Sequence, residues 1–537
     1  MKPLRYARTL RHLKPWQVGG RLVAAAKRRA GLTRVPDPPA GLTNRLALRA
    51  PFHGHDPWNH REALLAGRFC FLNETAHLGT PVDWRAAGRS LLWQFNLHYF
   101  HYLHLLRPEE QVALCRSWIA SNPVGEGAGW YPYPTALRIV NWCRAGFTEP
   151  DLLASLYRQA AFLFRNLETY VYGNHLLENA RALVLAGRLF EGQGEASRWL
   201  EQGLALYRQE TPEQILPDGG HFERSPMYHA LMLEGYLDVL NVLPDAHPDR
   251  PWLVETANRM GDALRTMTHP DGGVALFNDA TLEIAPPPGQ ILNTLHALTG
   301  HTARRWEVLP DTGYFTYHDD ELYLILDGGP TGPDYLMAHA HADVFSFELS
   351  LHGHRVVVDS GVYEYPAGPM RDYVRSTAAH NTVTVDGQDQ IECWGSFRVA
   401  RRAAPVVEHI EAGGKTMRFA GRFEGYARLL GDGLVHRREV EVDAAQRVVT
   451  VRDRVDGRGR HRVESRLHFH PEVAVEAGEA VVFERNEAVG KIDVNRGHIR
   501  WEEGWYCPRF GVRERNPVMV LAADAGWPAV IAYQIHY

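Results

Sequence analysis

The sequence predicts an α+β protein with a helical domain followed by an antiparallel β-sheet domain, and three observations predict it. From about residue 60 to 305 the apolar residues recur at helical spacing. From about residue 306 to 537 polar and apolar residues alternate, with many β-branched side chains. The chain has 537 residues, 45% of them hydrophobic, which is enough for more than one core. Helices first and strands second favour two packed domains, and the cleft between two such domains is the default place for a ligand.

Residues 1–59 are predicted to form a basic arm and linker. Ten Lys or Arg residues precede Asp37, the first acidic residue, and no uninterrupted apolar run of a secretory signal is present. We therefore expect a cytoplasmic or inner-membrane-associated protein, and a periplasmic location stays open. The arm is compatible with peripheral contact to an anionic membrane surface, and equally with a helical arm packed on its own domain. No run approaches the ~20 apolar residues of a spanning helix.

Charge and cysteine content exclude several classes of function. The formal net charge of −5, from 58 basic and 63 acidic residues, gives no reason to expect a nucleic-acid partner. This net charge is still compatible with a local basic patch that binds an anionic small molecule or polymer. The five cysteines are far apart and form no CxxC pair, so neither a disulfide framework nor a thiolate zinc site is expected. Nothing in the sequence indicates the oligomeric state.

The first candidate site motif is YGNHLLENARAL, residues 172–183, inside a strongly helical stretch. Residues three or four positions apart share a helix face, so Glu178 can lie on one face with Asn174 and with His175. This helix could present an amide, an imidazole and a carboxylate to one cavity. A solvated helix turn with a His–Glu pair is the alternative.

The second motif is LPDGGHFERSPMYHALML, residues 216–233. Ser225 followed by Pro226 is typical of a helix N-cap with proline at the first helical position. Tyr228 and His229 then fall in the first turn. The positive end of the helix dipole would favour a phenolate or a bound anion there.

The third motif, residues 337–361, holds four histidines: His339, His341, His352 and His354. Alternation in a strand would direct the first two to the same side. Two histidines and one aspartate make a three-ligand zinc site if His341, Asp359 and His380 lie on neighbouring strands. The second pair flanks Gly353 and is expected in a hairpin turn.

Aromatic residues gather in 93–106 and 129–142. Rings at a cleft wall can stack on sugar faces, as Trp130 would, and an arginine such as Arg138 can pair with a carboxylate or sulfate. Most of these aromatic side chains are expected in the core of the helical domain.

Together these motifs resemble the heparinase II/III-like polysaccharide lyases, most densely at GNHLLEN, GGHFERSPMYH, AHAHAD, VVVDSG and AAHNTV. The resemblance implies an incomplete (α/α) toroid over 60–305 and an antiparallel β-sandwich over 306–537, with an anionic, uronate-containing polysaccharide held between them. It implies catalytic roles for four residues: Asn174, His175, Tyr228 and His339. We expect substrate contacts from four more: Arg138, Glu178, His229 and Trp130. It also implies a structural zinc ion held by His341, Asp359 and His380, and no organic cofactor.

The activity implied is β-elimination at a uronate, which leaves a C4–C5 double bond. Asn174 would neutralise the carboxylate, His339 would take the C5 proton, and Tyr228, with an ordinary pKa of ~10, would protonate the leaving oxygen. One tyrosine doing both proton transfers stays open. Sulfated glycosaminoglycan, hyaluronan, alginate and bacterial exopolysaccharide are all compatible substrates.

Two other functions are weighed against the lyase. A glycoside hydrolase would need two carboxylates flanking the scissile bond, and the candidates are Glu178, Glu223, Asp218 and Asp279. A protein of exopolysaccharide assembly with little catalysis is suggested by the basic arm and by the absence of a recognisable secretion signal.

Overall fold

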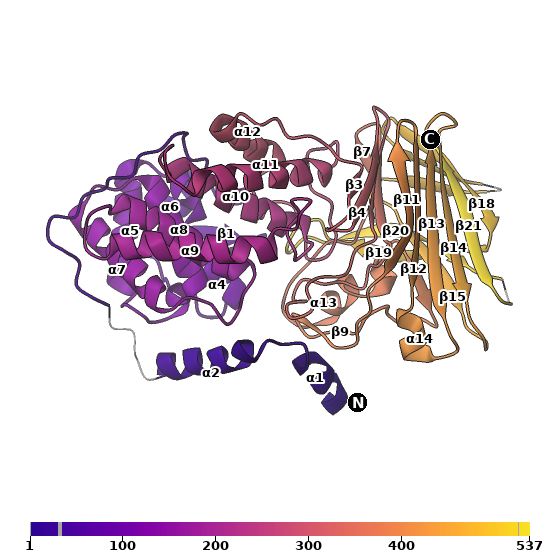
Figure 1. Cartoon of the computed structure of the whole chain (residues 1–537), viewed down its shortest axis with the longest axis horizontal. Helices are drawn as coiled ribbons and strands as arrows, with labels where there is room; N and C mark the ends of the chain where they lie inside the picture. The colour runs from indigo at the N-terminus through magenta and orange to yellow at the C-terminus, as the bar shows by residue number, and fades with distance from the viewer. Residues whose placement is uncertain (1, 30–34, 479, 525) are drawn as a thin grey trace.

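A computed structural model describes residues 2–29, 35–478, 480–524 and 526–537. It confirms the α+β class: a helical domain and a domain of antiparallel sheets lie end to end (Figure 1). The last helix before the sheets ends at Thr299 and the first strand of the sheets begins at Val308, on either side of the predicted boundary. Residues 1 and 30–34 of the predicted basic arm lie outside the described residues.

The helical domain is preceded by the two arm helices α1 (Lys2–Leu10) and α2 (Pro15–Arg29). Its own helices are α3 (Arg61–Leu65), α4 (Leu91–Tyr99), α5 (Pro108–Ser121), α6 (Pro132–Ala145), α7 (Pro150–Arg165), α8 (Asn174–Leu189), α9 (Ala196–Gln214), α10 (Pro226–Val242), α11 (Arg250–Thr266) and α12 (Pro288–Thr299). Two short 3₁₀ helices, η1 (His101–Leu105) and η2 (Ala128–Trp130), and a hairpin of β1 (Arg68–Phe71) and β2 (Glu74–His77) complete it.

The helices form two layers of an incomplete toroid. Helices α4, α6, α8 and α10 pack side by side in that order, while α7, α9 and α11 pack behind them. The chain reverses between successive helices, so the four inner helices run parallel and begin at the same edge of the domain. Proline opens α6, α7 and α10 at the first turn, where its missing N–H costs nothing. The edge where the inner helices begin carries the candidate site.

The second domain is built from antiparallel sheets. A five-stranded sheet holds β3 (Val308–Leu309), β4 (Tyr314–His318), β5 (Leu322–Asp327), β6 (Phe347–Leu351) and β7 (His354–Val357). A four-stranded sheet holds, in spatial order, β19 (His498–Tyr506), β20 (Glu514–Ala522), β15 (Val463–His468) and β8 (Val383–Val385). An eight-stranded sheet holds, in spatial order, β11 (Val406–Gly413), β12 (Thr416–Phe423), β13 (Val435–Asp443), β14 (Val448–Asp456), β21 (Ala529–His536), β18 (Ala488–Arg496), β17 (Val481–Arg485) and β16 (Ala474–Ala477). Short elements are β9 (Cys393–Trp394), β10 (Arg398–Val399), α13 (Pro369–Val374), η3 (Thr377–Ala379) and α14 (Gly425–Leu430).

The predicted hairpin turn in the histidine-rich segment is confirmed. Leu351 pairs with His354 across β6 and β7, so His352 and Gly353 form a two-residue turn. Both turn residues have positive φ, 47° and 86°, as the tightest hairpin turns require.

Each domain has its own core, and a third apolar cluster joins them. Met267 and Phe277, which follow α11, pack with Tyr314 and Ile325 of β4 and β5. Beside this cluster His269 contacts Glu348 at 2.8 Å, and both side chains are fully buried. The placement of the two domains is therefore fixed by apolar packing as well as by polar contacts.

The basic arm packs against both domains. On the β side, Arg5 Nε donates to Glu392 at 2.9 Å. Between the helices, Lys14 Nζ pairs with Glu213 at 2.7 Å and lies 3.8 Å from the Tyr335 ring centre. On the helical side, Trp16 donates to Thr169. Helices α1 and α2 consequently lie along one side of both domains (Figure 1). Within the described residues, no helix combines the length and apolarity needed to cross a membrane.

Candidate functional site

The site begins at the first residue of α8. Gly173 precedes it with φ +62°, and a Cβ there would lie 2.1 Å from Glu223 Oε1, so only glycine allows this close approach. Asn174 then donates its backbone N–H to Glu223 Oε1 at 3.1 Å and its side-chain amide to Oε2 at 2.9 Å. The sequence GNH therefore fixes the amide of Asn174 against a buried carboxylate.

Helix α10 supplies the tyrosine. As predicted, Ser225 caps the helix, since its Oγ accepts from the N–H of Tyr228 at 3.4 Å, and Pro226 occupies the first position. The Tyr228 hydroxyl lies 3.0 Å from the hydroxyl of Tyr365. Burial first, then the neighbouring Tyr365, raises the pKa of Tyr228 well above its ordinary value. Tyr228 is therefore protonated and can serve as a proton donor.

His339 reaches the same place from the β-domain. It lies in the connection between β5 and β6, so the predicted strand conformation of the H-x-H segment is wrong. Its ring packs against that of Tyr228, with 4.1 Å between ring centres and 33° between the ring planes. Nδ1 is 3.0 Å from Asp279 Oδ2, and Nε2 is 3.4 Å from Glu223 Oε2. The structure thus brings Asn174, Tyr228 and His339 together at the joint between the domains.

His175 lies next to this cluster and keeps 36% of its side chain exposed. Its ring packs on Tyr133 with 4.3 Å between centres, and Nδ1 is 3.2 Å from Glu168 Oε1. Burial alone would lower its pKa, but the charge and hydrogen bond of Glu168 outweigh this and raise the pKa of His175. An imidazolium at this position can attract a carboxylate.

Asp279 connects the two histidines of the H-x-H segment. Its fully buried carboxylate accepts from His339 Nδ1, from His341 Nε2 at 2.9 Å, and from both terminal nitrogens of Arg371 at 2.5 and 2.8 Å. Burial would raise the pKa of Asp279, but Arg371 and the two histidines hold it well below its ordinary value. Asp279 therefore orients the His339 ring.

Sequence reasoning considered Glu223 and Asp279 only as hydrolase carboxylates, and it missed Tyr365 and Arg371. The motif GGHFERSPMYH places Glu223 a few residues before Tyr228, and the motif FNDA places Asp279 near the end of the helical half of the chain. That signal alone cannot show which side chains the carboxylates contact.

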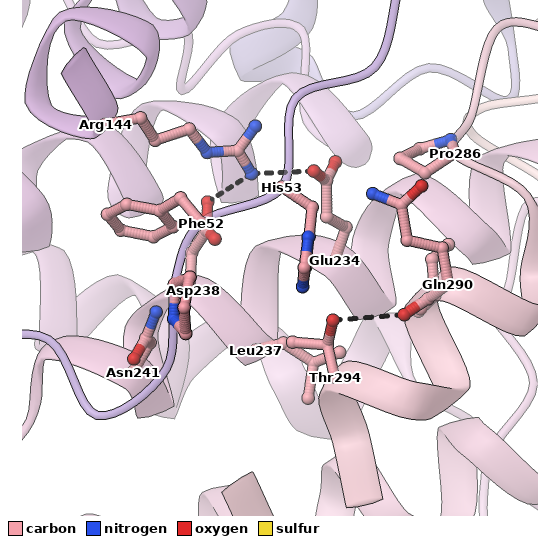
Figure 2. Close-up of a pocket in the computed structure, with 12 residues that line it drawn as sticks. Phe52, His53, Arg144, Glu234, Leu237, Asp238, Asn241, Pro286, Gln290 and Thr294 are labelled. Carbon is pink, nitrogen blue, oxygen red and sulfur yellow. Dashed lines mark hydrogen bonds and ion pairs between the residues drawn. The ribbon is translucent and has the colours of Figure 1, made fainter. Parts of the chain in front are cut away.

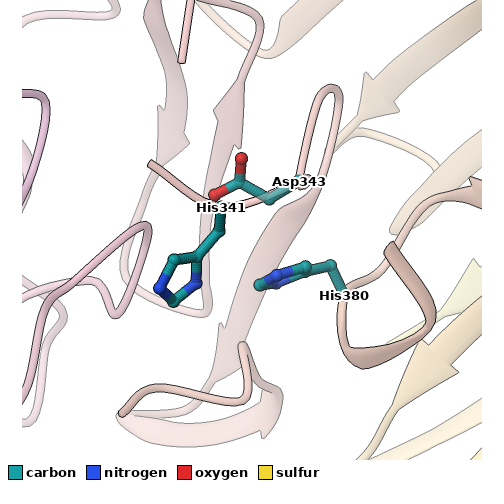
Figure 3. A group of neighbouring side chains, drawn as sticks. All are labelled: His341, Asp343 and His380. Atoms are coloured by element: carbon teal, nitrogen blue, oxygen red, sulfur yellow. The ribbon is translucent and has the colours of Figure 1, made fainter. Parts of the chain in front are cut away.

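His341, Asp343 and His380 form a compact group that could hold a metal ion, and one ligand atom from each lies within 4.8 Å of the others (Figure 3). Each has a buried polar atom without a hydrogen-bond partner: His341 Nδ1, Asp343 Oδ1 and His380 Nε2. Unpaired buried polar atoms are costly, so three in one place indicate a ligand set. Two imidazoles and a carboxylate suit zinc.

The predicted ligand Asp359 has a different position in this arrangement. Its Oδ2 contacts His380 Nδ1 at 2.8 Å, on the ring atom opposite the unpaired Nε2. A carboxylate at this position orients a histidine ligand instead of binding the metal itself. Asp343, four residues before the start of β6 in the AHAHAD motif, takes the place expected for Asp359.

Arg138 does not face a substrate, contrary to the prediction. Its side chain is fully buried, lies 3.9 Å from the Trp118 ring centre, and donates to Gly129 O at 2.7 Å and to Gln159 at 2.9 Å. Burial lowers its pKa to about 9. Arg138 thus stabilises the chain that leads into α6.

Glu178 is likewise structural. Both its oxygens accept from Arg181 at 3.1 Å, and Arg181 also pairs with Asp238. Arg144 extends this network to Asp238 and Glu234 beside a pocket of about 30 Å³ (Figure 2). That volume holds about one water molecule. The network joins α6, α8 and α10, so Glu178 serves the toroid rather than a ligand.

His229 and Trp130 also have protein partners. His229 is buried, Nε2 lies 2.8 Å from Met260 O, and burial lowers its pKa to about 4. The substrate contact predicted for His229 is therefore wrong. Trp130 is 5% exposed and donates to Asn122 O, but its ring borders a cavity beneath α2.

The four hydrolase carboxylates do not form a pair across an open site. Asp218 accepts from the backbone of Asp311 and Thr312, and the other three are buried with the partners given above. Without two free carboxylates facing one bond, hydrolysis lacks its acid and base.

Two family models match most of the chain. The model described as heparinase II/III N-terminus matches residues 111–286, and the one described as heparinase II/III-like, C-terminal, matches residues 301–528.

Curated relatives carry the name heparin-sulfate lyase. The protein of Pedobacter heparinus is 24% identical over 327 residues, which cover 52% of this chain and 48% of the relative. That of Bacteroides stercoris is 28% identical over 252 residues, 41% of this chain and 37% of the relative. The chain therefore matches about half or less of the length of these relatives.

Solved structures show the same fold. A structure titled heparinase III aligns with a TM-score of 0.67 at 18% identity and covers 95% of this chain and 88% of its own. Heparan sulfate lyase from Pedobacter heparinus aligns with a TM-score of 0.59 at 19% identity, over 96% of this chain and 87% of its own.

Proposed function

The chain belongs to the heparinase II/III family, and from this premise we propose that it is a polysaccharide lyase that cleaves uronate-containing polysaccharide by β-elimination. The observation that carries the proposal is the ring contact between Tyr228 and His339 beside the amide of Asn174. These groups can supply one sugar with a proton donor, a proton acceptor and an amide that hydrogen-bonds the sugar carboxylate.

The barrier of this reaction is electrostatic. The hydrogen at C5 lies next to a carboxylate, so its removal builds a second negative charge beside the first. One N–H of the Asn174 amide is held by Glu223, which leaves the other for the uronate carboxylate. The raised pKa of His175 favours a positive charge nearby. A well-placed donor of this kind contributes roughly 3–4 kcal/mol in other enzymes.

Two proton transfers complete the elimination. With the Nδ1–H of His339 donated to Asp279, Nε2, which lies 3.4 Å from Glu223 Oε2 in this structure, is the ring atom proposed to take the C5 proton. The C5–H and C4–O4 bonds break, the C4–C5 double bond forms, and Tyr228 gives its hydroxyl proton to the departing O4. His339 then returns its proton to Tyr228 through solvent.

We propose zinc as the ion for His341, Asp343 and His380, in a structural role. These residues and Asp279 connect the segment that carries His339 to the segment that carries His380. When bound, the ion would neutralise Asp343 and fix this segment beneath the catalytic cluster.

Heparan sulfate is the proposed substrate, on the names of the curated relatives. The test is a panel of heparan sulfate, heparin, hyaluronan, alginate and polyguluronate assayed for alkene absorbance. New absorbance with heparan sulfate supports the proposal. A reducing end released without an alkene would instead indicate hydrolysis, and no cleavage of any polymer would overturn it.

Contact with an anionic membrane is a separate proposal about location. On α1 and α2 the side chains of Leu4, Leu10 and Leu22 are 63%, 55% and 69% exposed among basic residues. Sedimentation with vesicles containing an anionic lipid should retain the full chain and release a chain lacking residues 1–35. Equal partitioning of both chains would end this proposal.

A further inference from the structure

A cavity of about 440 Å³ lies between the arm helix α2 and the beginning of the inner helices. Trp16, Gly20 and Lys27 border it on the arm side. Leu91 of α4 and Pro132 of α6 border it on the side of the toroid. This volume falls within the range of small-molecule binding sites. The arm thus forms one wall of a cavity that is partly open to solvent.

The lining has the chemistry of an acidic-sugar site. Aromatic side chains border it from both walls: Trp16, Trp130, Tyr131 and Tyr170. Lys27 and Arg165 add positive charge, and among the described residues no Asp or Glu lines the cavity. Arg165 is paired with Glu195 at 2.9 Å, whereas in the described part of the chain no carboxylate pairs with Lys27. Rings and an unneutralised cation suit a sugar that carries carboxylate or sulfate.

Two residues that line the cavity are close in sequence to residues at or beside the catalytic cluster. Tyr131 is two residues from Tyr133, which packs on His175. Tyr170 is four residues from Asn174. Because an extended chain spans at most about 3.5 Å per residue, the backbone of Tyr131 lies within about 7 Å of that of Tyr133, and the backbone of Tyr170 within about 14 Å of that of Asn174. Both sites are at the edge where the inner helices begin, so one polysaccharide can reach both.

We propose that this cavity is a remote subsite that binds an acidic sugar unit of the polysaccharide whose bond is cleaved at Tyr228 and His339. This rests on the proposed function. The arm then contributes directly to substrate binding through Lys27. Binding energy from a remote subsite favours long chains over short ones.

The test compares Lys27→Gln with Arg21→Gln, a matched control because Arg21 is exposed on α2 and does not border the cavity. The substrates are a tetrasaccharide and an octasaccharide of heparan sulfate, followed by alkene absorbance. For Lys27→Gln we expect the KM for the octasaccharide, relative to that for the tetrasaccharide, to rise about tenfold with kcat unchanged, as for loss of one charge-assisted hydrogen bond. Arg21→Gln should behave as wild type.

A binding measurement separates this inference from the proposed activity. Calorimetric titration of the octasaccharide into the wild type and both variants, each carrying Tyr228→Phe, reports affinity without turnover. Weaker binding only in the Lys27→Gln chain supports the subsite, even if no polymer yields an alkene. Equal affinity and equal KM ratios in the two variants overturn it, and alkene formation by the wild type would then leave the proposed function intact.

Discussion

At the residue scale, one hydroxyl is proposed to complete the reaction. Tyr228→Phe should lower alkene formation by about 10²-fold or more, because the departing O4 loses its proton donor. The thermal midpoint should change little, since among the described residues the hydroxyl hydrogen-bonds only to Tyr365. Tyr365→Phe is the matched control: it removes the same hydrogen bond, keeps the Tyr228 hydroxyl, and should retain most activity. Full activity of Tyr228→Phe would contradict the assigned role.

The charge of His175 predicts a pH dependence. Since Glu168 raises the pKa of His175 above its ordinary 6.5, the imidazolium persists to higher pH and is lost as pH rises through the folded-state value. We expect kcat/KM to fall over that range. The ion pair with Glu168 likewise stabilises the fold below pH 6.5 and stops doing so as pH rises further. In His175→Gln the fall of kcat/KM with rising pH should disappear. If the pH profile of this variant matched that of the wild type, the fall would belong to another titrating group.

Residue roles were predictable where a motif fixed the backbone, and not where packing decided exposure. GNH and SPMYH place Asn174 and Tyr228 at helix N-termini, and the structure brings both to the site. Glu178 and His229 are on the same two helices and Arg138 is on the neighbouring α6, but packing and polar protein partners bury all three. No local pattern distinguishes a buried, paired Arg138 from one that faces a ligand.

At the element scale, the segment from His339 to Asp343 connects the catalytic cluster to the metal group. Its alternation resembles a strand, yet its backbone bonds go elsewhere: His339 O accepts from Asp279 N, and Ala342 N donates to Arg375 O. Long-range hydrogen bonds therefore override the period-two pattern. The same folding brings Asp343, rather than Asp359, beside the unpaired atoms of the two histidines.

This arrangement makes a prediction about the metal. Asp343→Asn should abolish metal binding, because it removes a ligand, and should lower the thermal midpoint. Asp359→Asn should retain a site weakened by about 10–100-fold, because only the orientation of His380 is lost. Metal content by elemental analysis and titration with zinc distinguish the two variants. Loss of metal from the Asp359 variant alone would restore the ligand set predicted from sequence.

At the scale of the whole molecule, the order of domains follows from periodicity, but their placement does not. The change from helical to alternating spacing locates both halves of the chain. The contacts that join them, such as His269 with Glu348, connect residues about 80 positions apart. Such pairs carry no local signal. The arm is the extreme case, since Arg5 bonds to Glu392 and so spans most of the sequence.

The docking of the arm depends on one close approach, which gives a matched pair of variants. A Cβ at Gly20 would lie 2.4 Å from Tyr170 Cβ, so Gly20→Ala should displace α2 from the toroid. At Gly19 the nearest atom to a new Cβ is 3.9 Å away, so Gly19→Ala causes no clash. Alanine is also more favourable than glycine inside a helix, by about 1 kcal/mol. Limited trypsin digestion should therefore cleave at Arg21 and Lys27 faster in Gly20→Ala than in wild type, and no faster in Gly19→Ala. Equal cleavage of both variants would mean that α2 is not held against Tyr170. Faster cleavage confined to Gly20→Ala would show that the same contact holds the wall of the cavity in place.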